Sequence, residues 1–155
     1  MDISFKTEKG RFNYRVSAVI LRNECLLTVQ DNAYSYSYLP GGRVKMGESA
    51  EAALQRELQE ELHANLPILR PLWFCQDFFT EEDTLERFHE ICIYFLVDGR
   101  TLPEGDFSYP EGSRLNRFSW TPLAELGQMH LYPSFIRESI TCLPGHPEII
   151  IEQKS

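Results

Sequence analysis

The chain has 155 residues, enough for one domain with a proper hydrophobic core. Apolar residues at 43% and charged residues at 25% are the usual shares of a soluble globular protein, which excludes a disordered or fibrous chain. The net charge of -8 and the sequence pI near 5.0 argue against a general nucleic-acid coat, which needs a basic surface. A small phosphorylated ligand stays compatible with this charge, because a bound metal would reverse the local sign.

The sequence favours a cytoplasmic protein. The first twelve residues contain no apolar segment of signal-peptide length, and no apolar run is long enough to cross a bilayer. No C-x-x-C pair occurs among the cysteines, which are Cys25, Cys75, Cys92 and Cys142. We therefore expect reduced thiols, without a disulfide or a zinc site, in a single domain spanning residues 1–155.

The first elements in chain order are a hairpin and a short strand. Residues 12–29 contain two β-rich runs around Arg22-Asn23-Glu24, the pattern of a β-hairpin. Residues 33–39 (AYSYSYL) alternate strictly, which predicts a short strand with its three tyrosines on one side. Pro40-Gly41-Gly42 then interrupts regular structure and lets the backbone approach a ligand closely.

A helix is predicted from Ser49, a good N-cap, to about His63. At 100° per residue, three leucines form one stripe and three glutamates form the adjacent stripe. These residues are Leu54, Leu58 and Leu62, and Glu57, Glu60 and Glu61. Carboxylates crowded on one face repel each other and call for a cation, and oxygen ligands favour Mg²⁺, Mn²⁺ or Ca²⁺.

The second half of the chain predicts strands mixed with two further helical segments. In order, these are a strand at 71–79, a loop tip at 81–86, a strand at 88–97 buried on both faces, a long loop at 98–116, a short strand at 117–120, a helical turn at 121–126 with Pro122 at its first position, and an amphipathic helix at 133–142. Strands interspersed with two or three helices indicate an α/β or α+β domain.

A solvated helix face is the ordinary explanation of clustered glutamates. Three details weigh against it here. Arg56 can reach Glu60, but Glu57 and Glu61 have no basic residue at i±3 or i±4. A glycine pair and Glu48 stand just before the helix. The acidic stripe also adjoins the leucine stripe, so it lies at the edge of the core.

These residues resemble the Nudix box, G-x5-E-x7-R-E-U-x-E-E-x-G-U, in which U is aliphatic. The match runs from Gly42 through Glu48 and Arg56-Glu57-Leu58 to Glu60-Glu61, and it holds at every charged position. The last glycine of the pattern is His63 here, and the next aliphatic position is Ala64. These departures fall at the helix C-terminus, where they affect the turn more than the chemistry.

The resemblance implies a Nudix fold, an α/β domain with a mixed β-sheet sandwiched between helices. It implies hydrolysis of a nucleoside diphosphate linked to another group, with Mg²⁺ as cofactor and Mn²⁺ as a substitute. The implied metal ligands are Gly41, Glu57, Glu60 and Glu61. Glu57 or a glutamate outside the box would be the base. Arg56 would orient a carboxylate, and Glu48 would hold the metal or the loop–helix junction.

The residues that would contact the substrate lie outside the box. Our candidates are Tyr38, Arg43, Phe79 and Glu111; Glu111 is also the first candidate for an additional acid, with Glu90 second. A stacking wall for a base could come from several aromatic residues, namely Tyr34, Tyr36, Tyr38, Trp73, Phe74, Phe78 and Phe79. For each of them singly, packing in the core or sheet is the ordinary explanation.

The substrate class stays open at this point between ordinary or oxidised nucleoside triphosphates and nucleotide-sugar compounds. A non-catalytic nucleotide-binding module is the main alternative, although such modules often lose box acids and none is lost here. An isomerase or RNA-end hydrolase is a third class, but the acidic surface makes long RNA a poor partner. We expect a small-molecule partner and no membrane, and a homodimer remains an alternative.

Overall fold

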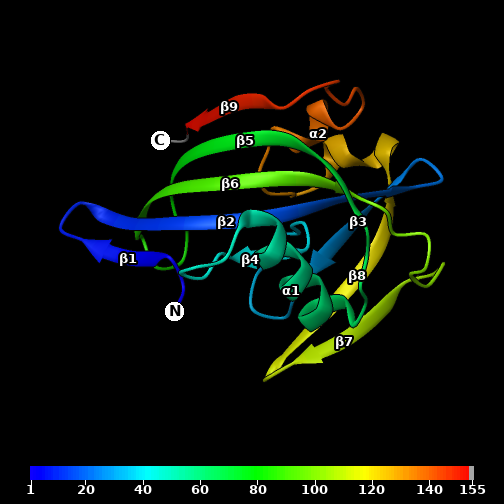
Figure 1. Ribbon diagram of the computed structural model, residues 1–155, viewed down its shortest axis with the longest axis horizontal. Helices are drawn as coiled ribbons and strands as arrows, with labels where there is room; N and C mark the ends of the chain where they lie inside the picture. The colour runs from blue at the N-terminus through cyan, green and yellow to red at the C-terminus, as the bar shows by residue number, and fades with distance from the viewer. Residues whose placement is uncertain (154–155) are drawn as a thin grey trace.

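The computed structural model describes residues 1–153 and contains a strongly curved, mixed β-sheet of nine strands (Figure 1). The strands are β1 Ser4–Thr7, β2 Gly10–Arg22, β3 Cys25–Gln30, β4 Gly41–Arg43, β5 Ile68–Thr80, β6 Arg87–Val97, β7 Phe107–Glu111, β8 Arg114–Pro122 and β9 Glu148–Gln153. The helices are α1 Ala50–Leu62, the 3-10 helix η1 Leu123–Gln128 and the short α2 Ile136–Ser139. No helix in this part of the chain has the length and apolar character needed to span a membrane.

The strand order is β7-β8-β3-β2-β6-β5-β9, and β1 and β4 also pair with β2. The long strand β2 runs parallel to β6, and β5 runs parallel to β9, while the other ladders are antiparallel. β2 therefore contacts four other strands, and the residues on its two faces take part in both sides of the molecule.

Two hydrophobic clusters lie on opposite faces of the sheet. Ala18 of β2 packs in one cluster with Leu54 and Leu58 of α1. The next residue, Val19, packs in the other with residues of η1 and α2. Because successive strand residues point to opposite faces, β2 supplies both clusters in alternation.

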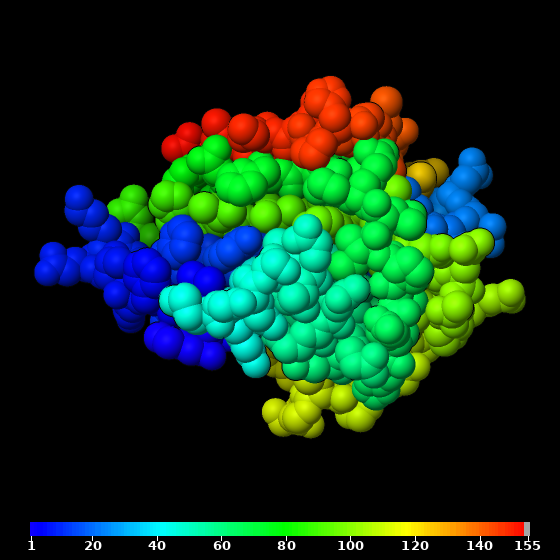
Figure 2. Space-filling view, viewed as in Figure 1, coloured from blue at the N-terminus to red at the C-terminus, as the bar shows by residue number. Residues whose placement is uncertain are grey.

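Helix α1 covers only part of the sheet face on which it packs. Figure 2 shows α1 over the lower part of this face, and β5 and β9 are not covered by a helix above it. Phe74 of β5 lies opposite Ile149 of β9, and Phe74, Ile149 and Ile151 are 37%, 71% and 67% exposed. The candidate site lies on the other face of these strands, so α1 meets it at one edge only.

The structure confirms the first hairpin and the helix of the box. β2 and β3 are joined by Asn23 and Glu24, both with positive φ. Helix α1 begins after Ser49, whose side chain accepts a hydrogen bond from the Ala52 N–H, and ends at His63. His63 is left-handed, with φ 54°, so it adopts the conformation that glycine favours at this position.

Several predictions about the elements were wrong or incomplete. Residues 33–39 form a looped segment with isolated bridges at Ser37 and Tyr38, since only these two meet a partner strand or loop. The loop predicted at 98–116 contains strand β7, and the strand predicted at 117–120 extends over Arg114–Pro122. Pro122 is the N-cap of η1 and precedes its first residue.

The helix predicted at 133–142 is reduced to the four residues of α2, with turns on either side. Strands β1, β4 and β9 were not expected at all. Pro40-Gly41-Gly42 was predicted to interrupt regular structure, but Gly41–Arg43 pairs with β2 as strand β4. Strands β1 and β9 lie at an edge of the sheet or beside its end, where pairing with one neighbour decides the strand.

The cysteines occupy different environments. Cys75 and Cys92 are buried, Cys25 is half-buried and Cys142 is exposed, and all four are free thiols. Cys25 and Cys92, which lie in apolar runs of the sequence, were expected in the core; Cys92 is buried there, whereas Cys25 is only half-buried. Burial raises the pKa of the Cys92 thiol to about 12, so this side chain behaves as a small apolar group.

Candidate active site

Helix α1 carries the acidic residues of the box to one wall of a cavity. Leu54, Leu58 and Leu62 are at most 1% exposed and fix the rotation of the helix against the sheet. With these leucines buried, Glu57 and Glu61 point toward the Gly41-Gly42 turn of β4. The predicted arrangement of an acidic stripe at the edge of the core is confirmed for these two residues.

Arg56 ties the loop before α1 to the helix. Its Nε donates to Glu48 Oε2 at 2.7 Å, and its Nη2 donates to Glu48 Oε1 at 2.9 Å. Nη2 also donates to the Arg43 carbonyl oxygen at 3.0 Å, and Nη1 donates to Glu57 Oε1 at 2.9 Å. The planar guanidinium group can make all these bonds at once, which a lysine could not do.

Glu48 is held from two sides. The Arg56 guanidinium and the Lys45 backbone N–H, which donates to Oε1 at 2.8 Å, stabilise its charged form. The hydrogen bond from Arg56 is the main cause that lowers the pKa of Glu48 to about 2. In this structure Glu48 fixes the loop–helix junction, which is one of the two roles expected for it.

Glu57 lies directly against Gly42. A Cβ atom at position 42 would overlap the Glu57 carboxyl group, so the turn needs glycine to leave room for this carboxylate. The Glu57 side chain is 14% exposed. Burial raises its pKa, and the hydrogen bond from Arg56 opposes that shift.

Glu61 is the most buried acid of the box, at 6% exposure. Its Oε1 accepts a hydrogen bond from the Gly41 N–H at 3.2 Å. Burial, followed by the charges of Glu57 and Glu111, raises its pKa well above the ordinary value. Two buried carboxylates that repel each other form an oxygen-donor pair suited to a hard divalent cation.

Glu60 has a different position. Its side chain is 50% exposed and lies 3.5 Å from Arg56 Nη1. Within residues 1–153, no three side chains of His, Cys, Asp or Glu form a group that could hold a metal ion as they stand. The donors that fit Mg²⁺ best in this geometry are therefore Glu57 and Glu61, beside the Gly41 backbone, and the role of Glu60 stays a prediction.

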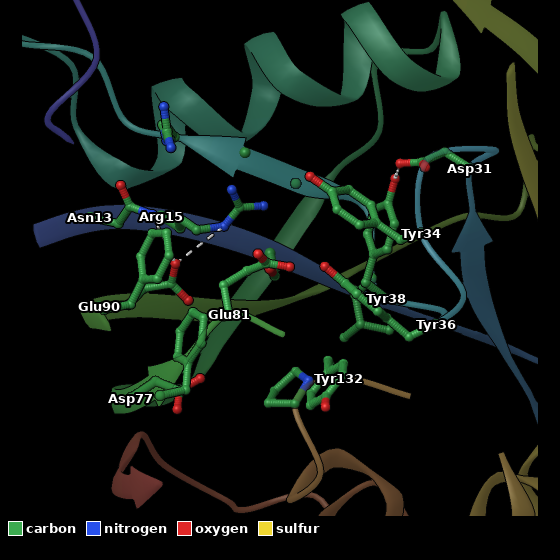
Figure 3. Close-up of a pocket in the computed structure, with 18 of the residues that line it drawn as sticks. Asn13, Arg15, Asp31, Tyr34, Tyr36, Tyr38, Asp77, Glu81, Glu90 and Tyr132 are labelled. Atoms are coloured by element: carbon green, nitrogen blue, oxygen red, sulfur yellow. Dashed lines mark hydrogen bonds and ion pairs between the residues drawn. The ribbon is translucent and has the colours of Figure 1, made fainter. Parts of the chain in front are cut away.

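The cavity next to these carboxylates has a volume of about 530 Å³ (Figure 3). It is bounded by β4 and α1, by the pocket-facing residues of β2, β5, β6 and β9, and by the loops that carry the tyrosines. All four substrate candidates line it, namely Tyr38, Arg43, Phe79 and Glu111. A cavity of this size suits a small ligand such as a nucleotide derivative.

The tyrosine loop forms one side of the cavity. Tyr34 stacks on Tyr36 with ring centroids 5.1 Å apart, and Tyr132 meets Tyr36 edge-on at 4.8 Å. The Tyr38 hydroxyl donates to Asp31 Oδ2 at 2.7 Å, and burial with this bond raises the Tyr38 pKa. The three loop tyrosines thus share one side as predicted, although they do not form a strand.

The other aromatic candidates divide between the cavity and the packing. Phe79 lines the cavity and stacks on Phe88. Trp73 is 2% exposed in the core, and Phe74 and Phe78 point to the opposite face of the sheet, away from the cavity. Their proposed role in a stacking wall was therefore wrong, because the alternation of β5 turns these side chains away.

The floor of the cavity contains polar residues that the sequence reasoning missed. Arg15 of β2 lies with its Nε 3.8 Å from Glu90 Oε1, and Asn13 Nδ2 donates to the same oxygen at 3.3 Å. Figure 3 shows these three side chains together at one side of the cavity. A signal was present in the sequence, because Asn13, Arg15 and Ser17 are polar at alternate positions of a strand that is otherwise largely apolar.

Glu111, the first candidate for an additional acid, lies at the end of β7 and lines the cavity. Its charge contributes to the raised pKa of Glu61, which places it near the carboxylates of the box. Its Oε1 accepts a hydrogen bond from Asn116 Nδ2 at 3.3 Å. The structure thus brings the two candidates Glu111 and Glu90 into the same cavity.

Comparison with known proteins identifies the class. The chain matches the NUDIX domain over residues 11–141, which is most of its length. Comparison with curated proteins gave no match. The match to the domain confirms the resemblance found in the box and shows that the chain belongs to the NUDIX domain family, whose members are pyrophosphohydrolases of small nucleoside diphosphate derivatives.

Solved structures with the same fold include an ADP-ribose pyrophosphatase from Streptococcus suis, with 18% identity, a TM-score of 0.60 and coverage of 90% of this chain and 98% of that chain. A mutator MutT protein from Bacillus halodurans has 13% identity, a TM-score of 0.64 and coverage of 92% and 90%. A MutT protein from Methanosarcina mazei has 22% identity, a TM-score of 0.57 and coverage of 86% and 92%. These likenesses confirm the Nudix fold.

Proposed function

We propose that this chain hydrolyses the diphosphate linkage of a nucleoside diphosphate joined to another group, with Mg²⁺ as its cofactor. The observation that carries the proposal is the position of Glu57 and Glu61, a half-buried and a buried carboxylate of the box on the wall of a cavity of about 530 Å³. Glu57 and Glu61 would hold the cation, with the Gly41 carbonyl as an additional oxygen. The bound ion would neutralise the diphosphate and acidify a water molecule.

The protein residues then have separate tasks. Arg56 keeps Glu57 in place through its hydrogen bond, and Glu48 keeps Arg56 in place. Glu111 accepts the proton of the attacking water, whose oxygen forms the new bond to phosphorus while the bridging P–O bond breaks. Glu111 suits this task because it lines the cavity near Glu61 but lies outside the helix that would hold the cation.

The charges of the residues that line the cavity limit which kind of group can be attached to the diphosphate. Its ionisable residues comprise nine acids against three arginines: Asp31, Glu57, Glu61, Asp77, Glu81, Glu82, Glu90, Glu111 and Glu152, and Arg15, Arg43 and Arg114. Such a surface disfavours further phosphates. It suits a neutral group with several hydroxyl or N–H donors, so we place nucleotide-sugar type substrates before triphosphates.

The test is a Mg²⁺-supplemented screen with products identified by mass spectrometry. The compounds are nucleoside triphosphates, 8-oxo-dGTP, ADP-ribose, nucleotide sugars, dinucleoside polyphosphates and coenzyme A. We expect cleavage at the diphosphate, highest kcat/KM for a neutral attached group, and no turnover with excess chelator. Binding without any product release would contradict catalysis and support a nucleotide-binding module.

Glu57→Gln supplies the matched variant for the same screen. It keeps the shape of the side chain but removes the charge, so we expect kcat to fall by several orders of magnitude. Glu51→Gln is the control, because Glu51 is an exposed acid in the first turn of the same helix. Equal activity of the two variants would remove Glu57 from the mechanism.

A further inference from the structure

Arg15 lies at the junction between the carboxylates of the box and the rest of the cavity. On β2 it is opposite Arg43 of β4 on one side and Cys92 of β6 on the other. Two residues further on, Ser17 is opposite Gly41, whose N–H binds Glu61. The pairing of the strands therefore places Arg15 next to the turn that supports the proposed cation site.

Arg15 shares its cavity with both carboxylates of that site. Arg15, Glu57 and Glu61 all line it, together with Gly41 and Gly42. The other two arginines of the cavity are paired elsewhere: Arg43 lies 3.8 Å from Asp2, and Arg114 lies 3.9 Å from Asp31. Arg15 is thus the arginine of the cavity with a position suited to act beside Glu57 and Glu61.

The Arg15 guanidinium group has an acid on its Nε side. Its Nε lies 3.8 Å from Glu90 Oε1, and Glu90 is fixed in turn by Asn13. The Arg15 side chain is 31% exposed and lines the cavity. Figure 3 shows the guanidinium group reaching past Glu90 into the cavity.

We propose that Arg15 binds the substrate diphosphate through its two Nη groups, with Glu90 as the residue that orients it. This inference rests on the function proposed above. A diphosphate has two phosphoryl groups. One can lie at the proposed cation site of Glu57 and Glu61, while the non-bridging oxygens of the other face the two Nη groups of Arg15. Paired N–H donors match such oxygens in a bidentate manner.

The alternative role is purely structural: Arg15 would only neutralise the buried Glu90. A lysine at position 15 would supply that charge as well, but it has no planar fork. Arg15→Lys therefore separates the two roles, and it keeps a cation beside Glu90 so that the fold is preserved. Arg15→Ala removes both the charge and the fork.

The experiment measures binding of methylenediphosphonate, a diphosphate with a CH₂ bridge and no nucleoside, in the presence of Mg²⁺ by calorimetry. We expect Arg15→Ala to weaken binding at least tenfold and Arg15→Lys to weaken it severalfold, with matching increases in KM for the best substrate of the screen. Glu90→Gln should give a smaller increase in KM than Arg15→Ala. Arg100→Ala is the control, since Arg100 pairs with Asp98 at the surface.

The outcomes separate the two proposals. Wild-type affinity and KM in Arg15→Lys and Arg15→Ala, with a changed melting temperature alone, would assign Arg15 a structural role and leave the proposed function intact. A wild-type protein that neither binds the probe nor hydrolyses any compound of the screen would overturn both proposals. Weakened binding with an unchanged melting temperature in Arg15→Lys supports the inference.

Discussion

The two walls of the cavity are built in different ways. The wall at α1 comes from one continuous segment, residues 41–61, in which a turn, a cap and a helix place Glu57 and Glu61. The facing wall comes from β2, β5, β6, β7, β8 and β9 and from three loops, each of which contributes one or a few residues. Local geometry positions the first wall, and strand pairing positions the second.

This difference explains how the two walls respond to change. In the α1 wall, a few bonds around Arg56 and one glycine control the position of the carboxylates. In the facing wall, Arg15 and Glu90 are held by long strand ladders, and single side chains can change without moving the backbone. We therefore expect the largest effects from substitutions in the α1 wall.

Among substitutions outside the proposed cation ligands, the strongest expected effect comes from Gly42→Ala. The new Cβ would overlap the Glu57 carboxyl group and displace it, and a shift of about 1 Å at a reacting centre can cost on the order of 100-fold in rate. The measurement is kcat/KM at saturating Mg²⁺. Gly105→Ala is the control, because a Cβ at Gly105 meets no atom within 4 Å. Similar activity of the two variants would show that the turn tolerates a side chain.

Arg56→Ala should reduce both stability and activity. It removes the charge-assisted bonds to Glu48 and Glu57 and leaves these carboxylates partly buried without their partner, which costs about 2 kcal/mol of unfolding free energy. Denaturant unfolding gives the free energy, and the accompanying loss of kcat should be about tenfold or more. An unchanged unfolding midpoint would contradict the role given to this arginine.

The pH dependence of Glu48→Gln tests the same network. Glu48 has a lowered pKa of about 2 in the folded protein, so its charged form stabilises the fold above its ordinary pKa. That contribution is lost as the pH falls toward 2. The difference in unfolding free energy between wild type and Glu48→Gln should therefore shrink from pH 6 to pH 2, and a constant difference would oppose this assignment.

A smaller effect is expected in the facing wall from Tyr38→Phe. The variant removes the hydrogen bond to Asp31 but keeps the ring, and Asp31 retains Arg114 at 3.9 Å. We expect the unfolding free energy to fall by about 1 kcal/mol and KM to increase by a few fold. Tyr109→Phe is the control, since Tyr109 lies outside the cavity. A decrease in kcat/KM as large as that expected for Gly42→Ala would show that the two walls of the cavity respond alike.

The smallest effect on activity is expected at the end of α1. His63→Gly removes the strain of a non-glycine residue with positive φ, but it also removes a ring whose centroid lies 4.2 Å from that of Tyr109. The unfolding free energy should therefore change by less than about 1 kcal/mol. His63→Val should be destabilising by about 1–3 kcal/mol, because a branched side chain disfavours positive φ. Both are measured by thermal unfolding, and kcat/KM should stay within twofold of wild type for His63→Gly.

The sequence could predict the α1 wall because the relevant interactions are local. Helical spacing placed Glu57 and Glu61 beside the leucines, and Ser49 and Pro40-Gly41-Gly42 marked the boundaries. Glu60 has the same spacing, but its side chain is 50% exposed and lies 3.5 Å from Arg56, and its role as a metal ligand stays a prediction.

The facing wall could not be predicted in the same way. That Glu90 lies beside Asn13 depends on a parallel register between strands about 77 residues apart, and no local pattern encodes this register. Glu111 was identified as a candidate, but it was assigned to a loop, because Tyr109-Pro110-Glu111-Gly112 has the composition of a turn. The β7 strand exists because β8 pairs with it.

The parallel ladder between β2 and β6 has a consequence for folding kinetics. Its two strands are separated by most of the first half of the chain, so closing it carries the entropy cost of a long loop. Arg15 and Glu90 come together only when this ladder forms, whereas α1 can form from local contacts alone. During refolding, helical signal should therefore appear before the ability to bind a diphosphate, and the delay between them would report the closing of the central ladder.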